Sequence, residues 1–183
     1  IVSMVARSRR FARHLHLPLQ HASDAVLRAM RRPYSFDEYR RLVESIRKAL
    51  PDAAIGSDVI AGFPGEGETE FEQMRERLPG LPLTHIHVFP YSDRPGTDAS
   101  RLRPKVGAAT IRRRCEELRR LAVALNARFV ASQIGSVRPA LTIEDGATAM
   151  TDNHLKVRIP EGRSRNVRVR VRITSASQGE VVA

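Results

Sequence analysis

The sequence predicts an α/β fold, in which parallel strands alternate with helices, followed by a small all-β domain. Apolar segments at residues 14–20, 55–63 and 84–91 have the length and pattern of strands, and helical segments separate them. Beyond Gly135 only short alternating segments follow, without helical periodicity. Since alternating strands and helices build parallel sheets, the first part is expected to be part of a barrel-type enzyme core.

The helical segments carry start signals and apolar faces. Ser35 stands three residues before Glu38, which is the pattern of a capping box, and a helix is expected from there to Pro51. Its expected apolar face consists of Tyr39, Leu42, Val43, Ile46 and Leu50. A further helix is expected at residues 69–78, and residues 1–11 have the pattern of the end of a helix.

A long amphipathic helix is expected over residues 108–134, because apolar residues recur there every three or four positions. It follows residues 95–109, which are rich in proline and glycine and are expected to form an irregular loop. Cys115 lies on the apolar face of the helix, so a buried structural thiol is expected rather than a ligand or nucleophile. The helix divides the chain into a core at residues 1–131 and a β domain at residues 132–183.

Composition limits the classes of protein to which the chain can belong. Its 183 residues, 42% of them hydrophobic, suffice for one domain with a small additional module. The single cysteine excludes an internal disulfide and favours a reducing, cytoplasmic location. No apolar run approaches the roughly 20 residues that a membrane span needs, so no membrane partner is expected.

The net charge of +11 is unevenly distributed, with two basic regions on either side of an acidic middle. A long polyanion such as RNA would explain this pattern, because basic side chains neutralise its phosphates. Arginine-rich helix faces in contact with water would give the same pattern. The charge alone therefore leaves both interpretations open.

A more specific cationic pattern lies in the β domain. Residues 166–173 alternate valine or isoleucine with arginine, so the arginines share one face of the strand, and residues 155–159 alternate in the same way. Such a face suits a small β-barrel that binds phosphates, although arginines also protect edge strands from aggregation. The predicted RNA-binding residues are Lys156, Arg158, Arg168, Arg170 and Arg172.

Side-chain alternation also predicts a site in the core. If the leucines of residues 14–20 pack against helices, the alternate side chains of each strand point into the barrel. Ligands of such barrels bind at the carboxyl ends of the strands, and Gly62 and Gly65 would let backbone approach a ligand closely. The resulting candidates are Gln20, Asp58, Ile60, Gly62, Phe89 and Tyr91.

Histidines on two of the strands raise a different possibility. His14, His16, His85 and His87 could bind zinc together with Asp58, as in a metal-dependent barrel hydrolase. However, His14 and His16 lie near the start of their strand, at the end of a barrel that is opposite to the catalytic end. No metal ligand is therefore predicted.

Three segments resemble the radical S-adenosylmethionine methylthiotransferases that modify tRNA. They are residues 16–20, His-Leu-Pro-Leu-Gln; residues 62–66, Gly-Phe-Pro-Gly-Glu; and residues 91–97, with Tyr-Ser and Arg-Pro-Gly-Thr. The resemblance extends through Ser23-Asp24, Val26-Leu27, Met30-Arg31-Arg32, Tyr34, Glu38-Tyr39, and Asp58 with Ile60. Residues 151–157 are similar to the MtaB-type branch, which modifies threonylcarbamoyladenosine beside the anticodon.

The resemblance implies the second half of a radical S-adenosylmethionine partial barrel, followed by a TRAM domain, a small RNA-binding β-barrel. It implies methylthiolation of position 2 of N6-threonylcarbamoyladenosine in the tRNA anticodon stem-loop, with S-adenosylmethionine and iron–sulfur clusters as cofactors. Gln20, Asp58, Ile60, Gly62 and Phe89 would then line the S-adenosylmethionine cleft. The arginines of residues 168–172 would hold tRNA phosphates, and the full-length protein is expected to be a monomer.

The chain departs from the family in its cysteines. The radical cluster of the family needs a C-x-x-x-C-x-x-C loop and a second cluster needs three more thiolates, whereas this chain has only Cys115. We therefore expect a carboxyl-terminal fragment that is inactive alone, with the cluster ligands in a missing amino-terminal part. His21-Ala22 replaces the usual Ser-Gly after Gln20, which bears on details of cofactor contact. The alternative interpretation is a tRNA-binding fragment without catalysis.

Overall fold

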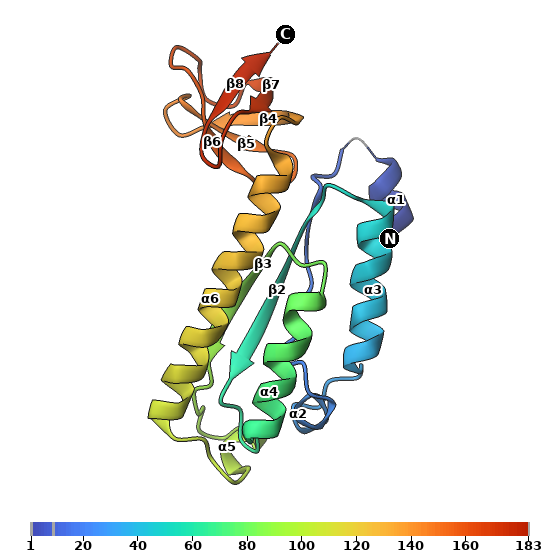
Figure 1. Cartoon of the computed structure of the whole chain (residues 1–183), viewed down its shortest axis with the longest axis vertical. Coiled ribbons are helices and arrows are strands. Elements are labelled where there is room, and N and C mark those ends of the chain that lie inside the picture. The colour runs from blue at the N-terminus through green and yellow to red at the C-terminus, as the bar shows by residue number, and fades with distance from the viewer. Residues whose placement is uncertain (1, 9, 183) are drawn as a thin grey trace. The chain divides into compact units, whose positions relative to one another are not determined.

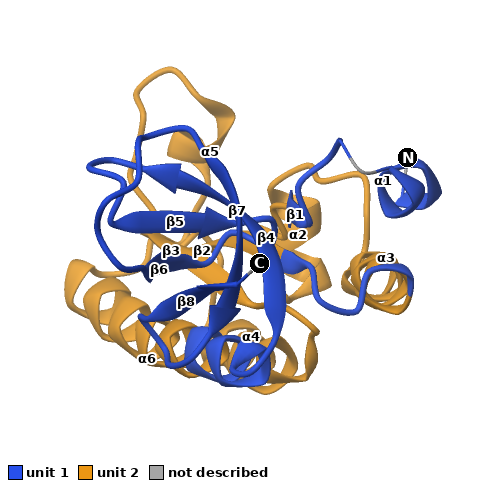
Figure 2. Ribbon diagram, turned by 90° about the horizontal axis from the view of Figure 1, so that it is seen from above, with its two compact units in different colours: residues 1–15, 49–54, 126–183 blue, residues 16–48, 55–125 orange. Residues whose placement is uncertain are grey.

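The computed structural model describes residues 2–8 and 10–182, which form two compact units (Figures 1 and 2). Unit 2 comprises residues 16–48 and 55–125, and unit 1 comprises residues 1–15, 49–54 and 126–183. Unit 2 has α/β architecture, and unit 1 contains an antiparallel sheet. The combination of an α/β part with a later all-β part is therefore confirmed, whereas the domain boundary after residue 131 stays a prediction.

A parallel sheet of three strands, in the order β1-β2-β3, positions the side chains of unit 2. The strands are β1 (His14–His16), β2 (Ala54–Ala61) and β3 (His85–Pro90). Strands β2 and β3 are parallel, with Asp58 opposite His87 and Ile60 opposite Phe89. These four side chains therefore share one face of the sheet, as the alternation predicted.

Strand β1 is shorter than the predicted strand at residues 14–20. Pro18 has no N–H to donate to a sheet, and Gln20 has a φ angle of 72°, which is outside the extended region. Gln20 nevertheless returns to the sheet, because its N–H donates to the Asp58 carbonyl and its own carbonyl accepts from Ile60. At the carboxyl end of the predicted strand, an isolated β-bridge to Val59 thus holds Gln20 beside β2.

The helices of this part of the chain are α2 (Asp24–Ala29), α3 (Phe36–Ala49), α4 (Glu68–Arg77), η1 (Leu78–Gly80), α5 (Asp98–Arg101) and α6 (Ala108–Gln133). The capping box of α3 is confirmed, since Ser35 and Glu38 each accept a hydrogen bond from the backbone N–H of the other. Two predictions were wrong. Leu42, predicted to lie on the apolar face of α3, is 42% exposed because it lies at the margin of that face. The irregular loop predicted at residues 95–109 contains helix α5, because the Thr97 side chain caps the start of this helix.

Helices α3, α4 and α6 contribute to the buried core of unit 2. The largest fully buried side chains include Leu19, Leu27, Ile46, Ile55, Phe71, Met74 and Leu118. Cys115 is buried, as predicted, and burial raises the pKa of its thiol. An inert thiol of this kind contributes to packing. Among the described residues, no helix is both long enough and apolar enough to cross a membrane.

Unit 1 contains the short helix α1 (Val2–Arg7), which ends earlier than the predicted segment at residues 1–11, and a sheet of five antiparallel strands. The strands are β4 (Val137–Ile143), β5 (Thr148–Thr151), β6 (Lys156–Arg158), β7 (Arg168–Ile173) and β8 (Gly179–Val182), in the order β6-β5-β4-β7-β8. The sheet is curled, because Arg158 on one edge strand pairs with Gln178, directly before the other edge strand. Ala140, Ala149, Val157, Ile159 and Val171 form its buried core.

A buried polar network in unit 1 surrounds the turn after β5. Arg138 donates to both carboxylate oxygens of Asp152, over 2.9 and 3.0 Å, and to Asp52 over 3.1 Å. Asn153 is fully buried and donates to the Asp52 carbonyl and to the Gln133 side chain. The run at residues 151–157 that resembles the MtaB-type branch thus begins with residues that stabilise unit 1.

Candidate cofactor site

Unit 2 contains a cavity of about 560 Å³ at the carboxyl end of its sheet. Four of the five positions predicted to bind a cofactor line this cavity, namely Gln20, Asp58, Ile60 and Phe89. Gln20 is held there by its bridge to β2, and the other three lie on the shared face of β2 and β3. The volume lies within the range of roughly 300–1,000 Å³ typical of small-molecule sites. The cavity therefore has the size of a small-molecule site, and both apolar and polar side chains line it.

The fifth predicted position, Gly62, does not line the cavity. Gly62 is buried with a φ angle of 86°, and a Cβ added to it would lie only 2.3 Å from Cγ1 of Ile111. Its N–H donates to the Glu66 carboxylate over 2.6 Å. Gly62 therefore lets helix α6 pack closely against the loop after β2, which is a structural role.

A buried ion pair fixes this loop. Glu66 and Arg114 are both almost fully buried, and Arg114 Nη1 lies 2.8 Å from Glu66 Oε1. The other carboxylate oxygen accepts from the N–H groups of Gly62 and Phe63. His21 Nδ1 accepts from the Ser23 N–H, so His21 Nε2 carries the proton and faces Glu66 Oε2 at 3.4 Å. Glu66 thus anchors the residues that follow β2.

The segment after β3 supplies a further polar group to the cavity. Tyr91 lines the cavity and donates a hydrogen bond to Asp93, which also pairs with Lys105. Desolvation, together with the neighbouring Asp93 carboxylate, raises the pKa of Tyr91 to about 12. The phenol therefore stays protonated at neutral pH. Tyr91 was among the candidates selected by strand alternation.

Sequence reasoning missed three arginines of the cavity wall, Arg31, Arg32 and Arg94. Arg31 pairs with Asp98 over 2.6 Å. Two of these arginines follow helix α2, and the third lies in the segment after β3, so all three occupy loops that meet the carboxyl ends of the strands. Basic residues at such loop positions are a signal for an anionic group of a ligand.

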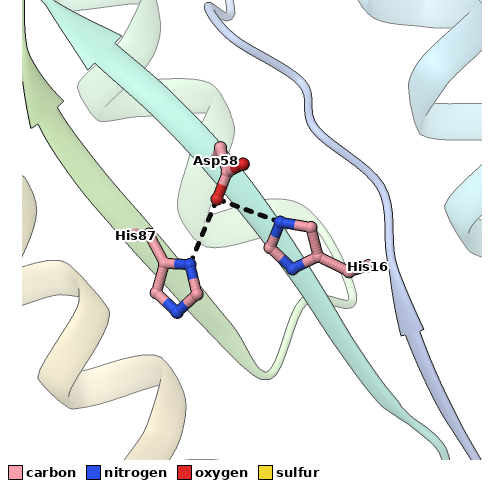
Figure 3. Close-up of side chains that lie close together, drawn as sticks. All are labelled: His16, Asp58 and His87. Atoms are coloured by element: carbon pink, nitrogen blue, oxygen red, sulfur yellow. Dashed lines mark hydrogen bonds and ion pairs between the residues drawn. The ribbon is translucent and has the colours of Figure 1, made fainter.

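A cluster of two histidines and one aspartate lies on the same sheet face (Figure 3). Oδ1 of Asp58 lies 3.0 Å from His16 Nε2 and 3.1 Å from His87 Nδ1. Figure 3 shows the two rings approaching this oxygen from the flanking strands β1 and β3. His14 belongs to unit 1 instead, where its ring stacks on His154. Of the five residues considered for zinc, the structure thus brings His16, Asp58 and His87 together, whereas His14 and His85 are not part of this cluster.

The predicted RNA-binding residues all lie in the curled sheet of unit 1 and are all exposed. Lys156 and Arg158 are on edge strand β6, and Arg168, Arg170 and Arg172 are on β7. Lys156 pairs with Glu144, whereas none of the three β7 arginines forms an ion pair with a carboxylate of residues 2–8 and 10–182. The β7 arginines thus form a cationic row without an ion pair among the described residues, with Glu180 opposite Arg172 on β8. Val167, which alternates with these arginines in the sequence, is 41% exposed because it precedes the strand.

Comparisons with known proteins relate the chain to one enzyme family. Residues 3–78 match the Radical SAM superfamily. The chain is 35% identical to the threonylcarbamoyladenosine tRNA methylthiotransferase MtaB of Aquifex aeolicus, over 86% of this chain and 38% of that protein. It is 34% identical to the tRNA-2-methylthio-N(6)-dimethylallyladenosine synthase of Thermobifida fusca, over 92% of this chain and 33% of that protein. The chain thus spans about a third of the length of these relatives.

Proposed function

Because the chain is related to the radical S-adenosylmethionine tRNA methylthiotransferases, we propose that it supplies part of the cofactor cleft and the tRNA-binding domain of such an enzyme. Unit 2 would be the second half of the partial barrel, and the curled sheet would be the TRAM domain. The single observation that carries the proposal is the convergence of Gln20, Asp58, Ile60 and Phe89 on one cavity.

The residues around the cavity suit S-adenosylmethionine. Ile60 and Phe89 offer apolar surface to the adenine ring of S-adenosylmethionine. Gln20 and Asp58 offer polar groups to the ribose and amino acid parts of the cofactor. The cofactor would supply the radical and the methyl group of the reaction. The role of the chain is to bind the cofactor, orient it and exclude water from it.

Iron–sulfur clusters do not fit the residues of this chain. Cluster ligation needs several thiolates, whereas the sequence has one cysteine, whose thiol is buried with a raised pKa. We therefore propose that the chain alone is inactive in methylthiolation.

Binding of S-adenosylmethionine tests the proposed cleft. Replacing Phe89 by alanine should weaken binding about tenfold, because removal of a ring from the cavity wall costs about 1.4 kcal/mol of binding free energy. Equilibrium dialysis of labelled S-adenosylmethionine against the purified chain measures this. Leu42→Ala is the matched control, since Leu42 is also an exposed apolar residue but does not line the cavity. Equal binding by both variants would refute the assignment.

We propose N6-threonylcarbamoyladenosine beside the anticodon as the substrate, and the arginines of β7 as phosphate contacts. Replacing Arg168, Arg170 and Arg172 together by alanine should lower the slope of log affinity against log salt by about 2–3, since each phosphate contact contributes roughly 0.7–0.9. Filter binding of an anticodon stem-loop that carries the modified nucleoside measures this slope. The slope should stay unchanged when Arg40, Arg75 and Arg113 are replaced, because these exposed arginines already pair with carboxylates.

The same assay tests the branch of the family. Relatives that match this chain act, by their names, on threonylcarbamoyladenosine or on dimethylallyladenosine. Stem-loops that carry either nucleoside should therefore be compared, and we expect tighter binding of the threonylcarbamoyl form. Tighter binding of the dimethylallyl form would overturn the branch assignment but not the proposal that tRNA is the partner. An affinity that does not change with salt would count against phosphate contacts altogether.

A further inference from the structure

We propose that His16, Asp58 and His87 bind a divalent transition-metal ion. The proposal rests on the geometry of these three side chains and does not depend on the proposed function. Two imidazoles and one carboxylate form a ligand set that suits zinc and ferrous iron. The three residues come from three neighbouring parallel strands, so the sheet itself brings the ligands together.

The spacing of the ligand atoms fits such an ion. The three ligand atoms lie within 4.8 Å of one another, and the two N–O distances are 3.0 and 3.1 Å. In a tetrahedral site with bonds of about 2.1 Å, neighbouring ligand atoms are about 3.4 Å apart. For these two nitrogen–oxygen pairs, the ion would therefore need the ligand atoms to separate by only a few tenths of an ångström. The ion would take the place of the protons that the ring nitrogens direct at Asp58, so each neutral imidazole would carry its proton on its other nitrogen.

A glycine provides the space for the histidines. A Cβ added to Gly56 would lie 2.2 Å from His85 Nε2 and 2.8 Å from His16 Nδ1. Gly56 does not have a positive φ angle, so its backbone does not require glycine. The absence of a side chain therefore serves the rings, which pack directly over the strand. This crowding restricts the ring of His16, and restricted ligands bind a metal ion with a smaller loss of entropy.

The ion would have at least one coordination position left for a further ligand. Three protein ligands with an open position are typical of zinc sites that bind substrate or water, whereas structural zinc sites have four protein ligands. Asp58 lines the 560 Å³ cavity as well as the cluster, so the ion would lie at the cavity wall. A carboxylate or amine of a ligand in the cavity could complete its coordination.

Titration with Co²⁺ tests the site, because cobalt bound to nitrogen and oxygen ligands in a tetrahedral site absorbs strongly in the visible range. The purified chain, stripped of metal with a chelator, should take up one equivalent of Co²⁺, and Zn²⁺ should displace it. His87→Ala and His16→Ala should each weaken binding at least tenfold. His154→Ala is the matched control, since His154 is also exposed but belongs to unit 1, and it should bind cobalt like the unaltered chain.

The outcomes separate this proposal from the proposed function. Loss of cobalt binding in His87→Ala, with a far-ultraviolet circular dichroism spectrum and melting temperature like those of the unaltered chain, supports the site. Saturable binding that persists in His87→Ala, or that is lost equally in His154→Ala, overturns it, as does the absence of binding. Since His87 is not among the residues proposed to hold S-adenosylmethionine, dialysis with the cofactor in metal-free buffer tests the proposed function independently.

Discussion

Replacing Glu66 by glutamine should lower the free energy of unfolding by about 3–5 kcal/mol, the cost of leaving one partner of a buried ion pair without the other. Arg114 is 4% exposed and Glu66 is fully buried, so the guanidinium would lose the buried one of its two carboxylate partners where water cannot replace it, and would keep only the exposed Glu68. The substitution keeps the shape of the side chain, so the loss reflects charge rather than a cavity. Urea denaturation of the purified chain measures the difference.

Glu68→Gln is the control for this prediction. Glu68 also pairs with Arg114, over 2.9 Å, but its side chain is 65% exposed. Ion pairs in contact with water contribute about 0–1 kcal/mol, so this variant should be almost as stable as the unaltered chain. Equal losses in both variants would show that burial of Glu66 does not govern the stability of the loop after β2.

The sequence predicted the elements of the fold better than their ends. Strand alternation and the capping box at Ser35 depend on local residues, and the structure contains both the strands and the cap. Strand β1 was predicted too long, because alternation does not reveal that Gln20 adopts a positive φ angle. Helix α5 was missed, because four helical residues capped by Thr97 give too short a pattern for periodicity to detect.

The candidate site was predictable where it depends on one strand and unpredictable where it depends on contacts between distant residues. Alternation selected Asp58, Ile60 and Phe89, which the register of β2 and β3 brings onto one face. No local pattern indicates that Arg114, far along the chain, reaches Glu66. Likewise, no local pattern indicates that His16, near the start of its strand, lies 3.0 Å from Asp58.

Replacing Gly62 by alanine should destabilise the chain by about 2–4 kcal/mol. About 1 kcal/mol comes from a side chain at a φ angle of 86°, which residues other than glycine rarely adopt. The rest, roughly 1–3 kcal/mol, comes from overpacking, because the new Cβ would lie 2.3 Å from Cγ1 of Ile111. Ile111 cannot easily turn away, since a β-branched residue in a helix has one preferred rotamer. Thermal and urea unfolding both measure this loss.

Gly65 separates the two contributions, because it has the same φ angle of 86° but would place a Cβ with nothing within 4 Å. Gly65→Ala should therefore cost only about 1 kcal/mol. A double-mutant cycle isolates the clash: in an Ile111→Ala background, Gly62→Ala should cost little more than Gly65→Ala, since the obstructing Cγ1 and Cδ1 are gone and only the Cβ at 3.3 Å remains close. If Gly62→Ala costs the same in both backgrounds, the contact with Ile111 does not explain the glycine, and close approach of backbone to a ligand again becomes the better explanation for Gly62.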